Sequence, residues 1–191
     1  MKEIICNIKS DLFRVTGQCG FFSFLKCLYS SPGFKFLFYF RLSQRYSRIT
    51  PFGFFSYLFY KHCSIKYGFQ IPLSVSLGKG LAFPHFGNIV INSKVSIGDN
   101  CNILHGVTLG NVKYGKNVGS PRIGNNVFIG PGSVIIGGIN VGNNTLIVAN
   151  SFVNVNVPDN CIAIGNPCKI ISSSISANVH MINNLSDFKQ C

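Results

Sequence analysis

Residues 123–157 read IGNNVFIGPGSVIIGGINVGNNTLIVANSFVNVNV, and their six-residue period decides the fold. An aliphatic residue recurs at every sixth position here and, in a first series, upstream: Ile91, Ile97, Ile103, Leu109, then Ile123, Ile129, Ile135, Val141, Ile147 and Val153. Four positions after most of them stands a small or β-branched residue, such as Val127 or Ser133. This periodicity is typical of a parallel β-helix, in which three hexapeptides form a coil of about 18 residues. We predict a mainly β protein, a left-handed parallel β-helix of about five coils.

Two irregularities interrupt this period. The step from Phe83 to Ile91 is eight residues, and the step from Leu109 to Ile123 is fourteen. Residues 110–122 are therefore expected to leave the column as a loop, and loops on rigid scaffolds are where sites tend to be built.

Composition divides the chain near Gly68. Residues 1–69 hold 13 of the 18 Phe, whereas residues 70–170 hold 15 of the 20 Gly. We expect an α-helical N-terminal region over 1–69, with helices over 2–19, from Pro32 and from Pro51. The β-helix domain is expected over 70–171, and a polar C-terminal tail, loose or docking, over 172–191.

The balance of charge indicates an anionic partner. Lys and Arg number 17 against 5 Asp and Glu, a formal net charge of +12. Nucleic acid is disfavoured because the cations are dispersed and no recognised motif is present. No stretch of 1–69 is apolar enough to span a bilayer, but peripheral contact with anionic lipid stays open. Without a signal-like start, and with eight Cys read as reduced, the chain is expected in the cytoplasm.

Two histidines hold the same place in the repeat. His85 and His105 each lie two positions after an inward residue and are 20 residues apart, one coil plus the two-residue insertion. Their backbones should lie about 4.8 Å apart on adjacent coils, beside the loop. An imidazole there could take a proton from an alcohol or amine that attacks an acyl group. A merely structural role for both stays open. A metal site is disfavoured because no third histidine stands at a matching offset.

Several strings resemble the serine acetyltransferase branch of the hexapeptide acyltransferases. They are SPGFKFLFYFRLSQ (31–44), FPHFGNIVIN (83–92), ILHGVTLGN (103–111), residues 121–153 and AIGNPCKI (163–170). Within that branch, HGVTLGN most resembles bacterial polysaccharide acetyltransferases of the colanic acid type.

This resemblance implies acetyl transfer from acetyl-CoA, without a metal, in a homotrimer with sites between neighbouring prisms. His85 falls on the family's catalytic base. The cofactor positions of the family fall on Gly130, Ala149, Pro167 and Lys169. The backbone near Gly110 is a candidate for holding the developing oxyanion. His105, or a backbone carbonyl, would orient His85.

Three departures from serine acetyltransferases bear on the acceptor. The family has an Asp where this chain has Pro84, an Asp where it has Gln70, and Arg-His-Pro where it has residues 119–121. We therefore predict an O-acetyltransferase acting on a sugar of a surface polysaccharide or its precursor. Serine O-acetylation for cysteine biosynthesis is the alternative, and a non-enzymatic β-helix scaffold is a third possibility.

Overall fold

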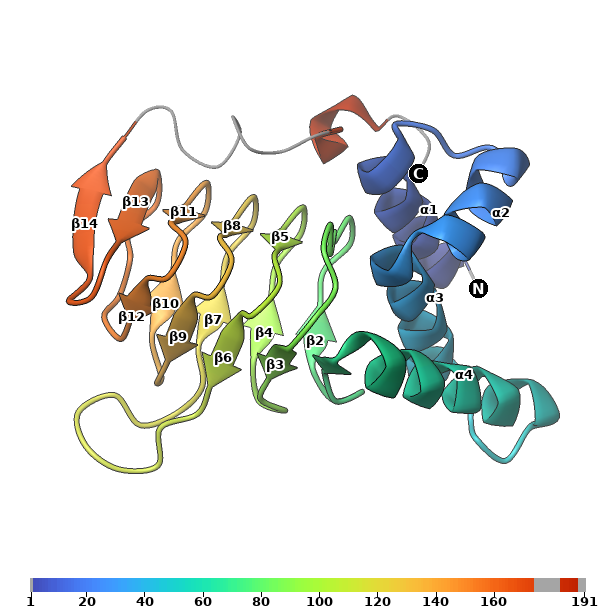
Figure 1. Cartoon of the computed structure of the whole chain (residues 1–191), viewed down its shortest axis with the longest axis horizontal. Coiled ribbons are helices and arrows are strands. Elements are labelled where there is room, and N and C mark those ends of the chain that lie inside the picture. Colours follow the sequence, from blue (N-terminus) through green and yellow to red (C-terminus); the bar gives the residue numbers. More distant parts are fainter. Residues whose placement is uncertain (1, 174–182, 189–191) are drawn as a thin grey trace.

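A computed structural model describes residues 2–173 and 183–188, and the chain forms a three-sided column with a helical bundle at one end (Figure 1). The bundle contains four helices: α1 (Lys2–Thr16), α2 (Phe21–Ser30), α3 (Pro32–Arg45) and α4 (Pro51–Tyr67). The two helices predicted from Pro32 and Pro51 begin at those residues, since Ser31 and Thr50 cap them by accepting hydrogen bonds from the N–H groups of Phe34 and Gly53. The first helix ends at Thr16, earlier than predicted, and α2 was not predicted at all.

Three sheets of very short strands form the sides of the column. The first sheet contains β1 (Phe69–Gln70), β3 (Ile89–Ile91), β6 (Thr108–Gly110), β9 (Val134–Ile136) and β12 (Phe152–Val153). The second sheet contains β2 (Ser76–Leu77), β4 (Ser96–Ile97), β7 (Arg122–Ile123) and β10 (Asn140–Val141). The third sheet contains β5 (Asn102–Ile103), β8 (Phe128–Ile129), β11 (Leu146–Ile147), β13 (Cys161–Ile164) and β14 (Lys169–Ser172).

The register of these strands is that of the six-residue period. Ile91 pairs with Leu109, and Ile135 with Val153, so equivalent aliphatic residues stack from coil to coil. All ten periodic aliphatic residues are buried. All named pairings are parallel except that of β14, which turns back antiparallel to β13 and ends the column. The predicted left-handed parallel β-helix with a helical N-terminal region is confirmed.

Asparagine makes the tight corner between the second and third sheets. Asn100, Asn126, Asn144 and Asn160 all adopt left-handed backbone conformations, with φ between 54° and 58°. Their side chains form a ladder, in which Asn126 Nδ2 donates to Asn144 Oδ1 at 3.0 Å and Asn144 Nδ2 to Asn160 Oδ1 at 3.1 Å. Asn tolerates this conformation better than residues without a short polar side chain, which explains its abundance in the repeats.

The helical bundle is joined to the first coil by a shared core. Phe36, Phe40 and Tyr60 belong to the same buried cluster as the column's aliphatic residues. The rings of Phe36 and Phe69 lie 4.7 Å apart between centroids, which closes the end of the column with aromatic side chains. Three of the 13 Phe of 1–69 therefore lie in this shared core.

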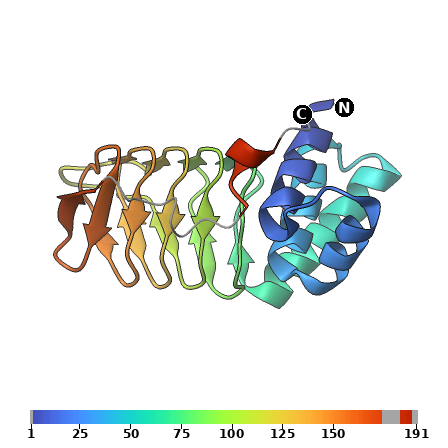
Figure 2. The same cartoon turned by 90° about the horizontal axis from the view of Figure 1, so that it is seen from above.

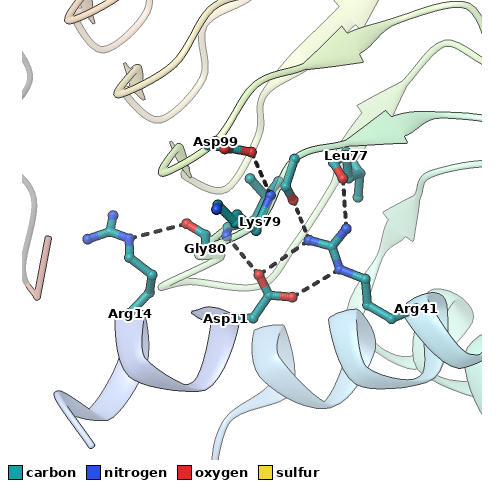
Figure 3. A network of polar contacts seen from close by, with 9 residues as sticks. Asp11, Arg14, Arg41, Leu77, Lys79, Gly80 and Asp99 are labelled. Carbon is teal, nitrogen blue, oxygen red and sulfur yellow. Dashed lines mark hydrogen bonds and ion pairs between the residues drawn. The ribbon is translucent and has the colours of Figure 1, made fainter. Parts of the chain in front are cut away.

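A buried ion pair reinforces that junction (Figure 3). Arg41 of α3 contacts Asp11 of α1 at 3.1 Å and donates to the carbonyl of Leu77 at 2.7 Å. Asp11 in turn accepts the N–H of Leu81 at 2.9 Å. Burial raises the pKa of the Asp11 carboxyl, and the Arg41 charge and the N–H groups of Gly80 and Leu81 oppose that rise. The pair therefore ties two helices and the first coil into one unit.

Residues 183–188, the described part of the tail, dock rather than hang loose. The 3₁₀ turn Leu185–Asp187 lies against α1 and the first coils (Figure 2). Phe188 contacts Phe13 with ring centroids 5.2 Å apart, and the N–H of Leu185 donates to Asn100 Oδ1 at 3.3 Å. The rest of the predicted tail lies outside the described residues, apart from Ser172 and Ser173.

None of the described helices is both long and apolar enough to cross a bilayer.

Candidate active site

The two histidines of the repeat lie side by side. A parallel bridge between Ala82 and Asn102 sets the register that brings His85 opposite His105. Their ring centroids are 5.8 Å apart, and the rings stand edge to face at 86°. Both side chains are exposed. Within the described chain, neither imidazole hydrogen-bonds to another protein group, so both rings are open to a ligand.

This pair sits at the corner between the third and first sheets, which we call the histidine corner. His105 follows β5, and on the next coils Gly130 follows β8 and Ala149 follows β11. The backbone repeats along this edge, since the N–H of Gly132 donates to the His105 carbonyl at 3.0 Å. Pro167 lies in the turn between β13 and β14, one coil beyond Ala149. One edge of the column thus carries both histidines and three of the expected cofactor positions.

Gly130 is the tightest point on this edge. A Cβ at Gly130 would stand 2.6 Å from the Ala149 nitrogen, closer than real side chains approach backbone. The N–H of Gly130 donates to the Ile147 carbonyl at 2.8 Å, which holds the two coils close together at this point. Ala149, Pro167 and Lys169 are exposed. Lys169 begins β14 and adds the positive charge that a phosphate would meet.

Gly110 does not join the histidines within one chain. It ends β6, so it lies at the corner between the first and second sheets, where the loop departs. Five residues of chain separate it from His105, which corresponds to about 16 Å along an extended strand. An oxyanion at the histidine corner cannot be held by the Gly110 of the same protomer.

Residues 110–122 leave the column as a loop that is pinned at its base. Val112 and Gly119 exchange two backbone hydrogen bonds of 2.9 Å, and Asn117 accepts the N–H of Gly138 at 3.0 Å. Ser120 Oγ donates to either of two amide oxygens, Asn92 Oδ1 at 3.0 Å or Asn111 Oδ1 at 3.2 Å. These contacts were not predicted, because Asn92 and Asn111 read as ordinary corner residues in the repeat.

A pocket of about 900 Å³ opens beside this loop base. The C-terminal half of α4 forms one wall with Tyr60 and Lys61, and the first sheet forms the other with Gln70, Asn92 and Gly110. Neither histidine lines it. Sequence periodicity could not reveal this pocket, because it depends on how α4 packs beside the column.

Acidic side chains stand at a different corner from the histidines. Asp99 accepts the N–H of Lys79 at 2.9 Å, and Asp159 accepts the N–H of Asn143 at 2.7 Å. Both therefore act as corner residues of the repeat. Among residues 2–173 and 183–188, no three His, Cys, Asp or Glu side chains gather as a metal site would require.

Comparison with known proteins identifies a matching family and several similar enzymes. Residues 120–155 match the family described as "Bacterial transferase hexapeptide (six repeats)". The chain is 32% identical over 181 residues to the chloroplastic serine acetyltransferase 1 of Arabidopsis thaliana, covering 93% of this chain and 57% of that protein. It is 39% identical over 104 residues to the probable serine acetyltransferase 1 of Oryza sativa subsp. japonica, covering 53% of this chain and 34% of that one. The chain thus spans only part of the length of these curated relatives.

A solved structure extends the likeness to three dimensions. The serine acetyltransferase of Neisseria gonorrhoeae, in complex with serine, superposes with a TM-score of 0.72 at 30% identity. The alignment covers 90% of this chain and 70% of that chain, so it includes helices as well as column.

The predicted sugar acceptor is therefore wrong, as is the assignment to the polysaccharide branch. Both plant relatives and the superposed bacterial structure are serine acetyltransferases. The prediction rested on side chains absent at Gln70, Pro84 and 119–121. Two of these positions keep a polar side chain in this chain, since Gln70 lines the pocket and Ser120 hydrogen-bonds to Asn92 beside it.

Proposed function

Because this chain belongs to the hexapeptide-repeat acyltransferase family, we propose that it is a serine O-acetyltransferase that uses acetyl-CoA. The observation that carries the proposal is the exposed His85–His105 pair, which begins the edge that continues through Gly130 and Ala149. The likeness to serine acetyltransferases supports serine as the acceptor and cysteine biosynthesis as the process served.

In the proposed reaction His85 is the general base. An imidazole nitrogen of His85 takes the proton from the serine hydroxyl as its oxygen bonds to the thioester carbonyl carbon. The tetrahedral intermediate then expels the CoA sulfur, which receives that proton from His85, so the histidine ends as it began. The products are O-acetylserine and CoA.

His105 has a positioning role in this proposal. Its ring stands at 86° to that of His85, with 5.8 Å between centroids, and so restricts how the His85 ring can turn. Pro84, the residue before His85, supplies no carboxylate that could orient the base.

The edge below the histidines is proposed to hold acetyl-CoA. The backbone of Gly130 and the exposed Ala149 would face the pantetheine arm, whose amides are hydrogen-bond donors and acceptors. Pro167 would pack on the nucleotide end, and Lys169 would contact its phosphate.

A homotrimer would reconcile Gly110 with this site. Flat sides of neighbouring columns can pack so that the loop corner of one protomer approaches the histidine corner of the next. Gly110 and the loop 110–122 would then complete a neighbour's site, although they lie a strand length from His105 of their own chain. Cytoplasmic reaction is proposed as well, in keeping with the seven free cysteines of the described residues.

The proposal is tested by measuring thiol release from acetyl-CoA with L-serine as acceptor. We expect turnover that requires serine, with O-acetylserine identified by mass spectrometry, and no turnover in His85→Gln. A thermal shift with CoA separates the steps, because ligand at 100 times its Kd stabilises by about 2.7 kcal/mol. A shift without serine turnover would refute the acceptor, and the absence of any shift at millimolar CoA would refute the enzyme in favour of a scaffold.

A further inference from the structure

Helix α4 is apolar on its exposed side as well as on its packed side. Gly53, Ser56, Tyr60 and Cys63 are buried against the rest of the protein. On the side next to these residues, Phe52, Phe55 and Phe59 follow one another at three- and four-residue spacing and are 55%, 58% and 49% exposed. A helix that is apolar all round is normally covered on both sides.

Helix α2 presents a second line of the same kind. Phe22, Leu25 and Tyr29 are 85%, 46% and 88% exposed, again at three- and four-residue spacing. A groove of about 360 Å³ separates the two lines, and Leu25, Tyr29 and Phe59 are among its lining residues. The two helices therefore share one continuous apolar surface.

The charges around this surface are all of one sign. Residues 21–67 contain seven Lys or Arg and no Asp or Glu. Lys35 and Lys66 line the groove itself, and Lys26 is exposed on α2 beside it. Arg41 is the exception, since Asp11 pairs with it in the interior.

The positive charge of this surface indicates what kind of partner it would bind. Two copies of the chain meeting through this surface would bring lysines against lysines while removing them from water, which is unfavourable. The described part of the C-terminal segment, 183–188, packs against α1 and the first coils instead. What remains is a partner that is apolar inside and anionic at its surface.

We propose that this surface docks on a bilayer containing anionic phospholipid. We define it as the α2–α4 face: Phe22, Leu25, Lys26, Tyr29, Lys35, Phe52, Phe55, Phe59 and Lys66. The aromatic rings enter the boundary between headgroups and acyl chains, and the lysine ammonium groups reach the lipid phosphates. Each such lysine contributes in proportion to the negative surface potential, so binding depends on lipid charge and falls with salt.

Vesicle co-sedimentation of the full-length protein tests this. We expect binding to vesicles of equal parts phosphatidylcholine and phosphatidylglycerol, and binding at least about tenfold weaker to phosphatidylcholine alone. Lys35→Gln with Lys66→Gln should weaken binding to the anionic vesicles about tenfold. Phe55→Ser with Phe59→Ser should weaken it at low and high salt alike. Phe22→Ser provides an independent apolar test if the double variant does not fold by circular dichroism.

A matched control separates the face from overall charge. Lys113→Gln with Lys116→Gln removes two exposed cations from the loop, so net charge falls equally while the face is intact. Equal loss of binding in that control, or equal binding to both vesicle types, would overturn the proposal. So would a change of oligomeric state in lipid-free Phe55→Ser with Phe59→Ser, seen by sedimentation velocity, because a second copy would then cover the face.

Discussion

At the scale of single residues, the two imidazoles at the histidine corner carry different parts of the proposed chemistry. His85→Gln should lower kcat by about 10²- to 10⁴-fold, since general-base catalysis contributes that much. His105→Gln should have a smaller effect on kcat and should shift the pH–rate profile, because it alters the setting of the base. Steady-state kinetics across pH checks both, with His62→Gln on α4 as the control. Equal loss from the two variants would contradict this division of roles.

Asn126 tests the corner ladder. Its φ is 56°, and its side chain joins Asn144 at 3.0 Å. Asn126→Ala should destabilise by about 2–3 kcal/mol, from left-handed strain and lost hydrogen bonds. Asn126→Gly should cost less, because glycine adopts that conformation freely. Urea unfolding at fixed protein concentration measures both. If glycine proved as costly as alanine, the backbone conformation would not be the cause.

Cys101 tests burial inside the column. Its side chain is 0% exposed, and burial raises the pKa of its thiol to about 12. Near pH 8 only about 10⁻⁴ of such a thiol is ionised, and the thiolate is the reactive form. N-ethylmaleimide should therefore label half-exposed Cys168 rapidly and Cys101 only after unfolding. Peptide mass mapping reads this directly, and equal labelling rates would contradict the inward placement.

Among the elements, the loop 110–122 is the part most separable from the column. Val112 and Gly119 pair across its base, so residues 113–118 can be replaced by Asn-Gly, which favours a tight two-residue turn. Lys113 and Tyr114 are exposed, but the replacement also removes the hydrogen bond from the Gly138 N–H to Asn117. We therefore expect a small decrease in Tm and at least about a tenfold loss of transfer. Full activity in the shortened protein would exclude the loop from the site.

Co-expression with His85→Gln extends that test to the proposed trimer. If one protomer supplies the histidines and its neighbour the loop, mixed assemblies regain part of the activity that each variant lacks. Activity no higher than that of the two variants alone would place each site within a single chain.

The helices and strands also show which parts of the structure could be predicted from the sequence. The ten aliphatic positions and the His85–His105 pairing follow from the period. A six-residue phase determines which side chains point into the column and to which coil each residue belongs. The same phase places Gly110 one corner beyond His105, so the sequence alone could have shown that the two lie apart within one chain. Helix α2 lies outside any period and has no cap in the sequence to mark it. The predicted sugar acceptor was wrong because it rested on a few side chains, at Gln70, Pro84 and 119–121. The similarity to serine acetyltransferases extends over most of the chain.

For the whole molecule, the decisive contact is between the helical bundle and the column. The predicted parts, 1–69 and 70–171, share one hydrophobic core, and the Asp11–Arg41 pair of the first part hydrogen-bonds to the backbone of Leu77 and Leu81 in the second. Arg41→Met should destabilise by about 3–5 kcal/mol, because it leaves a buried carboxylate unpaired. Asp11→Leu with Arg41→Met should recover part of that loss. Urea unfolding followed by circular dichroism compares them, and a double variant no better than the single one would contradict the assignment of the loss to an unpaired charge.

The regular stacking of coils fixes the distances between positions along one edge of the column. From His105 through Pro131 and Asn150 to the turn at Pro167 there are three steps of about 4.8 Å, or roughly 14 Å. Backbone bonds such as Asn150 N–H to the Pro131 carbonyl, at 2.9 Å, set each step. Side-chain replacement cannot change that span, whereas deletion of one whole coil shortens it by a single fixed increment. For the proposed acetyl-CoA site, the number of coils between the two ends of this edge therefore sets the length of cofactor that the edge can span.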